Sequence, residues 1–94
     1  MKTIIIEDEK PAARRITKLL LEVDPGIEIL GVLDSVESAT QWLTKNPSPD
    51  IMFMDINLGD GSSFEILKKT NVACPVVFIT AYDEFAIDAF KVNS

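Results

Sequence analysis

Histidine is absent from this sequence of 94 residues, and cysteine occurs only once, as Cys74. Without histidine the chain lacks the commonest general acid–base side chain, most kinds of zinc site and any means of acting as a phosphohistidine donor. A single cysteine excludes an internal disulfide and fits a reducing compartment. We therefore expect a cytoplasmic protein in which Cys74, before Pro75 at an expected strand start, is a small packing residue.

Positive charge is also scarce, because 9 Lys and Arg face 15 Asp and Glu, for a net charge of −6. This balance is unfavourable for holding phosphate backbones, so we expect no direct nucleic-acid binding by this segment. No apolar run approaches the roughly 18 residues of a membrane span, and the N-terminus has no signal-peptide layout, so we expect no membrane attachment. The apolar share of 47% suits one small folded domain.

A short apolar run that ends in a carboxylate, Ile51-Met52-Phe53-Met54-Asp55, organises what is present. Pro49-Asp50 precedes it and Gly59-Asp60-Gly61 follows it, which indicates a central parallel strand covered on both faces. In open α/β sheets, chemistry takes place in the crevice at the carboxyl ends of the strands. Asp55 is therefore expected at a site of chemistry.

Three further apolar runs predict strands, and helical patterns separate them. The predicted strands cover residues 2–6, 27–32, 50–56 and 75–79. The first helix has Ala13, Ile16, Leu20 and Val23 at helical spacing. Asp34 with Glu37, and Ser62 with Glu65, have the spacing of capping boxes for the next two helices, and Asp83 begins a fourth. The order βαβαβαβα predicts an α/β fold, a doubly wound parallel sheet with helices on both faces.

Polar groups at the ends of three predicted strands are expected to converge: Glu7 and Asp8, then Asp55, then Thr80. Carboxylates packed at one edge repel each other unless a cation offsets their charge. All-oxygen ligands suit Mg²⁺ or Mn²⁺. Beside such an ion Asp55 is a candidate nucleophile toward a phosphoryl group, to which Thr80 would donate a hydrogen bond. The alternative without a function is that these are three unrelated solvated acids in loops and a threonine at a strand end.

The segments Glu7-Asp8-Glu9, Met54-Asp55-Ile56 and Ile79-Thr80-Ala81 resemble the signature positions of response-regulator receiver domains of two-component systems. The stretches IIIEDEKPAARR and ITAYDEFAIDAFKVNS are most similar to receivers of the LytR/AlgR type, which usually precede a LytTR DNA-binding domain. The resemblance covers the whole chain, residues 1–94. It implies a flavodoxin-like receiver fold with strand order 2-1-3-4 in the part present.

The resemblance also implies roles for individual residues. Asp55 would be the phosphoacceptor and Thr80 the switch hydroxyl. Asp8 and Asp55 would be direct metal ligands, and Glu7 would be a water-mediated one. The backbone carbonyl of Asn57 would complete the protein's ligands to Mg²⁺. Asn57 and Tyr82 match positions that tune phosphorylation and hydrolysis rates.

Two departures from the family pattern stand out. Gly59 replaces a proline common in the loop after the acceptor. The fifth strand with its lysine, and the fifth helix, do not occur in these 94 residues, so the resemblance implies a C-terminally truncated receiver without its output domain. Lys91 would lie roughly 12 Å along a helix from the active edge, too far to replace that lysine.

The missing strand leads to two further expectations. The fourth strand, residues 76–79, would become an edge with unpaired backbone, so we expect self-association through it. Phosphorylation is expected to be weaker than in a full receiver, because an ammonium that counters phosphoryl charge is lacking.

The leading functional interpretation is a signalling receiver that takes a phosphoryl group from a sensor histidine kinase and switches a downstream output, which the resemblance implies is transcription. It would not be an enzyme beyond assisting its own phosphorylation and dephosphorylation. One alternative is an Mg²⁺-dependent phosphohydrolase, disfavoured because Asn57 stands where such enzymes place a second acid. The other is a phosphate-independent interaction module, against which the intact Asp8, Asp55 and Thr80 weigh.

Overall fold

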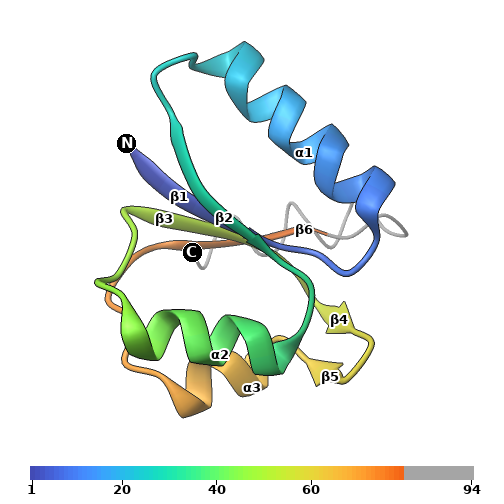
Figure 1. Ribbon diagram of the computed structural model, residues 1–94, viewed down its shortest axis with the longest axis vertical. Coiled ribbons are helices and arrows are strands. Elements are labelled where there is room, and N and C mark those ends of the chain that lie inside the picture. Colours follow the sequence, from blue (N-terminus) through green and yellow to red (C-terminus); the bar gives the residue numbers. More distant parts are fainter. Residues whose placement is uncertain (80–94) are drawn as a thin grey trace.

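A four-stranded parallel sheet is the centre of the computed structural model, which describes residues 1–79 (Figure 1). Its strands lie in the order β2-β1-β3-β6, with these bounds: β1 Lys2–Ile6, β2 Glu28–Leu33, β3 Ile51–Asp55 and β6 Val76–Ile79. Since β6 is the fourth of the predicted strands, the expected order 2-1-3-4 is confirmed. The expected helix from Asp83 lies outside the described residues.

Within residues 1–79, three helices cover the sheet from two sides: α1 (Lys10–Val23), α2 (Val36–Lys45) and α3 (Phe64–Lys69). In Figure 1, α1 lies on one side of the sheet and α2 and α3 lie together on the other. This layering confirms the predicted doubly wound α/β architecture. None of the helices in residues 1–79 is long and apolar enough to cross a membrane.

The main core lies between the sheet and the helices α2 and α3. Alternate residues of a strand point to opposite faces, so one set of each strand enters this core. Its members are fully or almost fully buried: Ile4, Ile6, Val36, Ala39, Met52, Met54, Leu58, Ile66 and Phe78. On the opposite face Ile5 is fully buried, and Ala13 is the buried residue of α1. Burial on both faces explains why the strands read as nearly continuous apolar runs.

The start of α2 differs from the sequence-based expectation. Ser35, not Asp34, is the N-cap, and the reciprocal partner is Ser38, not Glu37. The Ser35 hydroxyl accepts a hydrogen bond from the Ser38 N–H at 3.0 Å, and the Ser38 hydroxyl accepts one from the Ser35 N–H at 3.2 Å. The motif is a capping box shifted by one residue, because serine hydroxyls meet the same need as the predicted acids.

Two other local expectations also fail. Ser63, not Ser62, is the N-cap of α3, and no side-chain cap bond forms there; instead the Ser62 hydroxyl accepts from the Phe64 N–H at 3.2 Å. Val23, predicted for the apolar stripe of α1, is 83% exposed because it is the last residue of the helix, just before the turn that leads to β2. These misses lie at helix ends, where spacing alone is a weak guide.

Candidate functional site

Parallel register brings the acidic side chains of β1 and β3 to one edge of the sheet. Ile6 pairs with Met54, so the next residues, Glu7 and Asp55, leave the two strands side by side. The N–H of Glu7 donates to the Leu33 carbonyl of β2 at 2.9 Å, which keeps the chain on the sheet for one residue beyond β1. Asp8 follows at the first residue of the connecting loop. The expected meeting of these acids therefore has a direct geometric cause.

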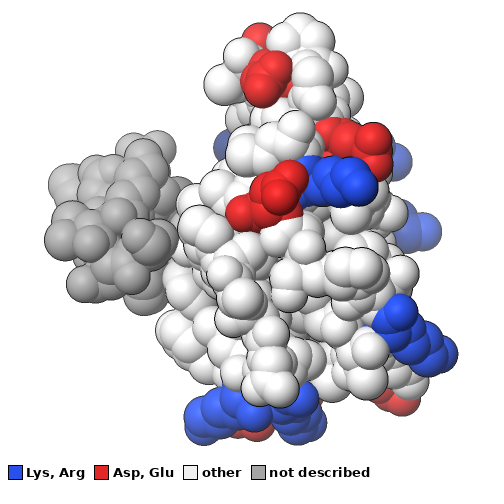
Figure 2. All heavy atoms as spheres, turned by 90° about the vertical axis from the view of Figure 1, so that its left-hand side faces the viewer, with Lys and Arg blue, Asp and Glu red and all other residues white. Residues whose placement is uncertain are grey.

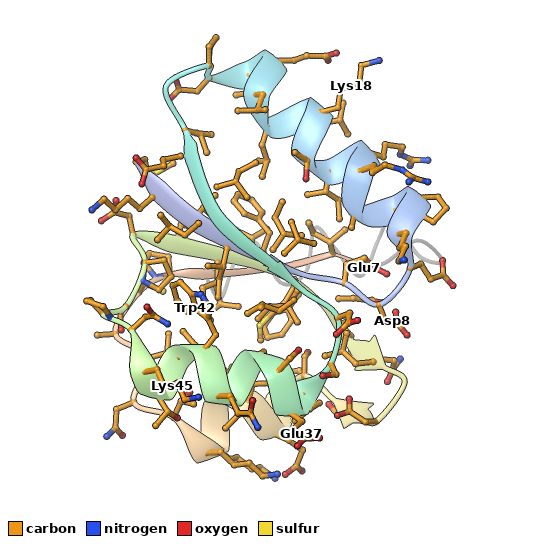
Figure 3. The ribbon with its side chains drawn as sticks, in the orientation of Figure 1. Glu7, Asp8, Lys18, Glu37, Trp42 and Lys45 are labelled. Atoms are coloured by element: carbon orange, nitrogen blue, oxygen red, sulfur yellow. The ribbon has the colours of Figure 1, made fainter. Side chains whose placement is uncertain are left out.

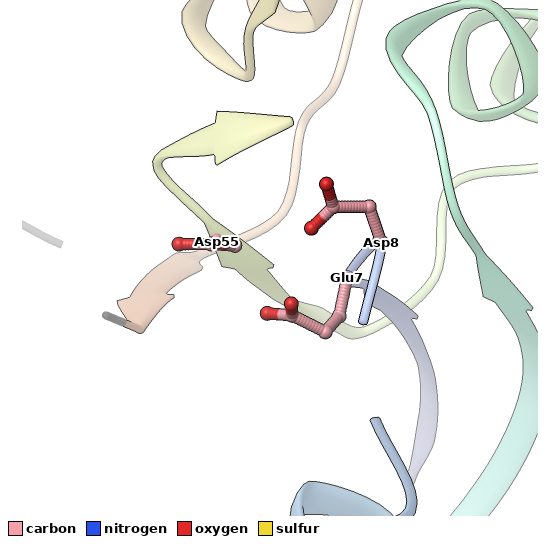
Figure 4. A group of neighbouring side chains, drawn as sticks. All are labelled: Glu7, Asp8 and Asp55. Carbon is pink, nitrogen blue, oxygen red and sulfur yellow. The ribbon is translucent and has the colours of Figure 1, made fainter. Parts of the chain in front are cut away.

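Glu7, Asp8 and Asp55 form an acidic cluster in which one carboxylate oxygen from each residue lies within 4.8 Å of the others. Figure 4 shows the three side chains extending from the ends of β1 and β3 into one region. Glu7 is buried, Asp55 is half-buried and Asp8 is exposed. The cluster is thus closed on the protein side and reachable from solvent at Asp8.

Burial raises the pKa of Glu7 to about 7, and the charges of Asp55 and Asp8 add to the effect. The N–H of Glu9, which donates to Glu7 Oε1 at 3.1 Å, opposes the rise because it favours the charged carboxylate. Removing a carboxylate from water disfavours its ionised form, and neighbouring negative charges act in the same direction. Between about pH 4.5 and pH 7, Glu7 is therefore largely protonated, whereas an ordinary glutamate is ionised in this range.

Burial likewise raises the pKa of Asp55, and the negative charges of Asp8 and Glu9 contribute. The Ile56 N–H donates to Asp55 Oδ1 at 2.8 Å, which favours the ionised form and limits the shift. This bond also fixes the orientation of the carboxylate relative to the strand. Asp55 is held in place, with its charge incompletely balanced.

The donor set of the cluster fits a hard divalent cation. It offers carboxylate oxygens alone, which Mg²⁺, Mn²⁺ and Ca²⁺ prefer over nitrogen and sulfur ligands. The neighbouring charges that act on Glu7 and Asp55 within the described residues are other carboxylates. At the opposite end of the molecule, by contrast, acidic side chains lie among basic and uncharged ones (Figure 2). A cation would offset the repulsion at the strand ends.

A two-stranded hairpin, which was not among the predicted elements, follows directly after β3. It consists of β4 (Asn57–Leu58) and β5 (Gly61–Ser62), which pair antiparallel. The turn signal Gly59-Asp60-Gly61 is visible in the sequence and indicates such a hairpin, but its strands are too short to show alternation. Asn57 is exposed and lies at the start of the hairpin, two residues after Asp55.

Thr80 and Tyr82, expected at the same site, lie outside the described residues, as does Lys91. Trp42 is half-buried, points from α2 toward the sheet, as Figure 3 shows, and packs against the main core. Cys74 is also half-buried and packs against the main core, and burial raises the pKa of its thiol. Both residues lie apart from the acidic cluster and play no part in it.

Comparison with known proteins agrees with this geometry. The response regulator receiver domain family matches residues 4–93. Sensory transduction protein LytT of Bacillus anthracis is 44% identical over 97 aligned positions, and Transcriptional regulatory protein LytR of Staphylococcus aureus strain N315 is 34% identical. Both alignments cover 100% of this chain, but the chain spans only 39% of the length of these relatives.

Solved structures show the same fold. The response regulatory domain of protein mrkE from Klebsiella pneumoniae aligns with a TM-score of 0.74 and 30% identity, over 100% of this chain and 78% of that chain. The response regulator PhyR from Brucella abortus aligns with a TM-score of 0.73 and 30% identity, over 86% of this chain and 33% of that chain.

Proposed function

The chain belongs to the response regulator receiver family and is a receiver domain of the LytT/LytR type, and on this premise we propose that Asp55 accepts a phosphoryl group. A receiver domain is not a classical enzyme; the proposal is that residues 1–94 assist only their own phosphorylation and dephosphorylation. The observation that carries the proposal is the cluster of Glu7 and Asp8 around the fixed carboxylate of Asp55.

In the proposed reaction, a carboxylate oxygen of Asp55 attacks phosphorus of a phosphohistidine on a sensor kinase. The new O–P bond gives an acyl phosphate, and the P–N bond breaks as the histidine leaves with its electron pair. The Ile56 N–H holds Oδ1 of Asp55, so the side chain need not be ordered during the reaction. Asp55 must be ionised to attack, and its raised pKa opposes this in the absence of a cation.

Asp8 and Asp55 would hold Mg²⁺ or Mn²⁺ directly, Glu7 would contact it through water, and the backbone carbonyl of Asn57 would be the further protein ligand. When bound, the ion supplies positive charge that neutralises the phosphoryl oxygens. The buried position of Glu7 supports an indirect role, because a buried carboxyl group with a pKa of about 7 is only partly ionised at neutral pH. Thr80 as the switch hydroxyl, and Asn57 and Tyr82 as rate-tuning positions, complete the proposal.

The wider role concerns more than these 94 residues. We propose that residues 1–94 are the receiver portion of a longer cytoplasmic response regulator, controlled by a sensor histidine kinase and followed by a LytTR output domain that regulates transcription. The chain's span of 39% of its LytT and LytR relatives leaves room for such a domain in a protein of that length. Phosphorylation of Asp55 would then shift an equilibrium that the output region senses.

Self-association through the fourth strand is a separate part of the proposal. Within residues 1–79, β6 lies at the end of the sheet and pairs with β3. An edge strand is a template for pairing with another chain. Light scattering over a range of concentrations tests the idea, since a monodisperse monomer at high concentration contradicts it.

The main test is mass spectrometry after incubation with acetyl phosphate and Mg²⁺. Wild type should gain the mass of one phosphate, Asp55→Asn should gain none, and Asp8→Asn should gain much less because the cation is lost. Asp24→Asn is the matched control, because the Asp24 carboxylate lies at the far end of α1 and accepts a hydrogen bond from the nearby Gly26 N–H. Chelation of Mg²⁺ should abolish uptake by the wild type.

Other outcomes identify other functions. Steady turnover of a phosphoester substrate supports a phosphohydrolase, in which Asp55 would be a catalyst and not a stored-signal site. Uptake that persists in Asp55→Asn rejects the assignment of the acceptor. A complete lack of uptake, even in a chain lengthened with the downstream sequence of a LytT relative, supports a phosphate-independent interaction module.

A further inference from the structure

Asp60, in the turn of the β4–β5 hairpin, joins this hairpin to the start of a distant helix. Its Oδ1 accepts a hydrogen bond from the Val36 N–H at 2.8 Å, and its Oδ2 accepts one from the Glu37 N–H at 3.1 Å. Both donors belong to the first turn of α2, 24 and 23 residues away in sequence. The carboxylate thus spans two adjacent backbone amides of another element.

Helix α2 therefore receives caps from two sources. The first N–H groups of any helix have no partner within the helix and need one from outside. Ser35 serves the Ser38 N–H, while Asp60 serves the two amides that Ser35 does not. These backbone bonds lower the pKa of Asp60, so it is ionised at neutral pH and places negative charge at the positive end of the helix dipole.

The β4–β5 hairpin also contacts the hydrophobic core, the start of α3 and the acidic cluster. Leu58 is 7% exposed and belongs to the same core cluster as Val36. The Ser63 N–H donates to the Ile56 carbonyl at 2.9 Å and closes the base of the hairpin. Gly59 lies beside the acidic cluster, where a methyl group on its Cα would be 3.7 Å from Asp8 Oδ2. One short hairpin therefore touches the cluster on one side and α2 on the other.

We propose that Asp60 is a positioning residue for the acidic site: by fixing the hairpin to α2 it holds the Asn57 backbone where it can complete the cation's ligands. This inference rests on the proposed function, because Asn57 matters only if a cation binds. Asn57 is exposed and lies on a strand of two residues, so it has little local support of its own. Asp60 supplies that support from across the domain.

Thermodynamic linkage makes the relationship reciprocal. If the Asp60 bonds favour cation binding, then cation binding favours the Asp60 bonds to the same extent. The amides of Val36 and Glu37 should therefore become better protected when the site is filled. Cation binding at the acidic site would therefore change the stability of the first turn of α2.

The test is titration with Mn²⁺ alone, followed by the loss of the free-ion signal in electron paramagnetic resonance. Asp60→Ala should weaken Mn²⁺ binding about three- to tenfold, near the low end for residues that orient metal ligands indirectly. Asp60→Asn keeps one acceptor oxygen, so it should bind Mn²⁺ at least about twofold more tightly than Asp60→Ala. Equal weakening in both variants means that only charge matters, and it overturns the positioning role.

Two controls separate positioning from stability and from charge. Ser35→Ala removes the helix's own cap and lowers stability, but it should leave Mn²⁺ affinity within about twofold because the hairpin bond to α2 remains. Asp34→Asn removes one negative charge at the same helix start and should also have little effect. If either control weakens binding as much as Asp60→Ala, the inference is wrong.

Amide hydrogen exchange gives a readout in the unmodified protein. Saturating Mg²⁺ should slow exchange at Val36 and Glu37 at least about threefold in wild type, and less in Asp60→Ala. Unchanged exchange in a wild type that binds the ion contradicts the inference alone. A wild type that binds no Mn²⁺ and takes no phosphoryl group refutes the proposed function, and this inference with it.

Discussion

Ile6 of β1 is the register partner of Met54 of β3, and this pairing sets the position of the acidic cluster. Both side chains are fully buried in the same core, so a slip of one residue between β1 and β3 would move them out of their packed positions. The core therefore fixes the register, and the register places Glu7 next to Asp55. The spacing of the carboxylates is a consequence of hydrophobic packing beneath them.

In the absence of divalent cations, stability should fall as pH rises from about 4.5 to about 7. The pKa of Glu7 rises from its usual 4.5 to about 7 on folding, so over this range the native state binds a proton that the unfolded chain has lost. The free energy of unfolding should decrease by at most about 1.4 kcal/mol per pH unit for this proton, and level off above pH 7. Urea unfolding in EDTA measures the slope.

Saturating Mg²⁺ should reduce or reverse that slope. A bound cation favours the ionised carboxylates, which lowers their pKa in the native state. Urea unfolding at the same pH values, with Mg²⁺ in place of EDTA, provides the comparison. Identical slopes in the two series would mean that no cation reaches the cluster.

Asp55→Asn should stabilise the cation-free protein at pH 8 by about 1 kcal/mol, although it removes the proposed acceptor. The variant loses a half-buried charge that Asp8 and Glu9 repel, while its amide oxygen can still accept from the Ile56 N–H. Glu28→Gln removes an exposed charge at the start of β2 and should change stability by less than about 0.5 kcal/mol. A destabilised Asp55→Asn would contradict the destabilising effect assigned to burial and charge repulsion at Asp55.

Gly61→Ala should destabilise the domain by about 1–3 kcal/mol. Gly61 has φ of +147°, a backbone conformation that residues with a Cβ rarely adopt, and it pairs with Leu58 in the hairpin. Gly59→Ala is the matched change in the same turn, without a positive φ and with space for the methyl group, and it should cost less than about 1 kcal/mol. Thermal unfolding followed by circular dichroism compares the two; equal losses would mean that backbone conformation is not the cause.

Ile66→Ala should be among the most damaging single changes in the described residues, at about 2–4 kcal/mol. Ile66 is fully buried and is the buried residue of the short helix α3, so its loss leaves a cavity against the sheet. Leu19→Ala removes the same kind of group at a position that is 51% exposed and should cost less than about 0.5 kcal/mol. Urea unfolding of both variants checks the contrast.

The fold class was predictable because apolar runs and turn residues mark the strands strongly, whereas the strand order was implied by the resemblance to receiver domains. The convergence of Glu7, Asp8 and Asp55 was predictable for the same reason, since parallel strands end at one edge. Their roles in phosphoryl transfer and metal binding stay predictions. So do those of Asn57, Thr80 and Tyr82.

The local contacts were less predictable. The cap of α2 was misplaced because Asp34, Ser35 and Glu37 are all plausible capping residues, and only the folded backbone decides between them. The hydrogen bonds of Asp60 were missed because its partners lie 24 and 23 residues away, beyond the reach of any local motif. Contacts made by short strands and turns depend on the tertiary structure, which sequence periodicity does not describe.

The central position of β1 has a consequence for synthesis on the ribosome. β1 emerges before both of its partners, because it pairs on one side with β2 and on the other with β3, and the Thr3 hydroxyl donates to the carbonyl of Ile51, 48 residues later. Until that segment is made, the run Ile4-Ile5-Ile6 lacks one of its two neighbouring strands and is a candidate for aggregation. The nascent chain should therefore depend on chaperone protection until β3 has left the exit tunnel.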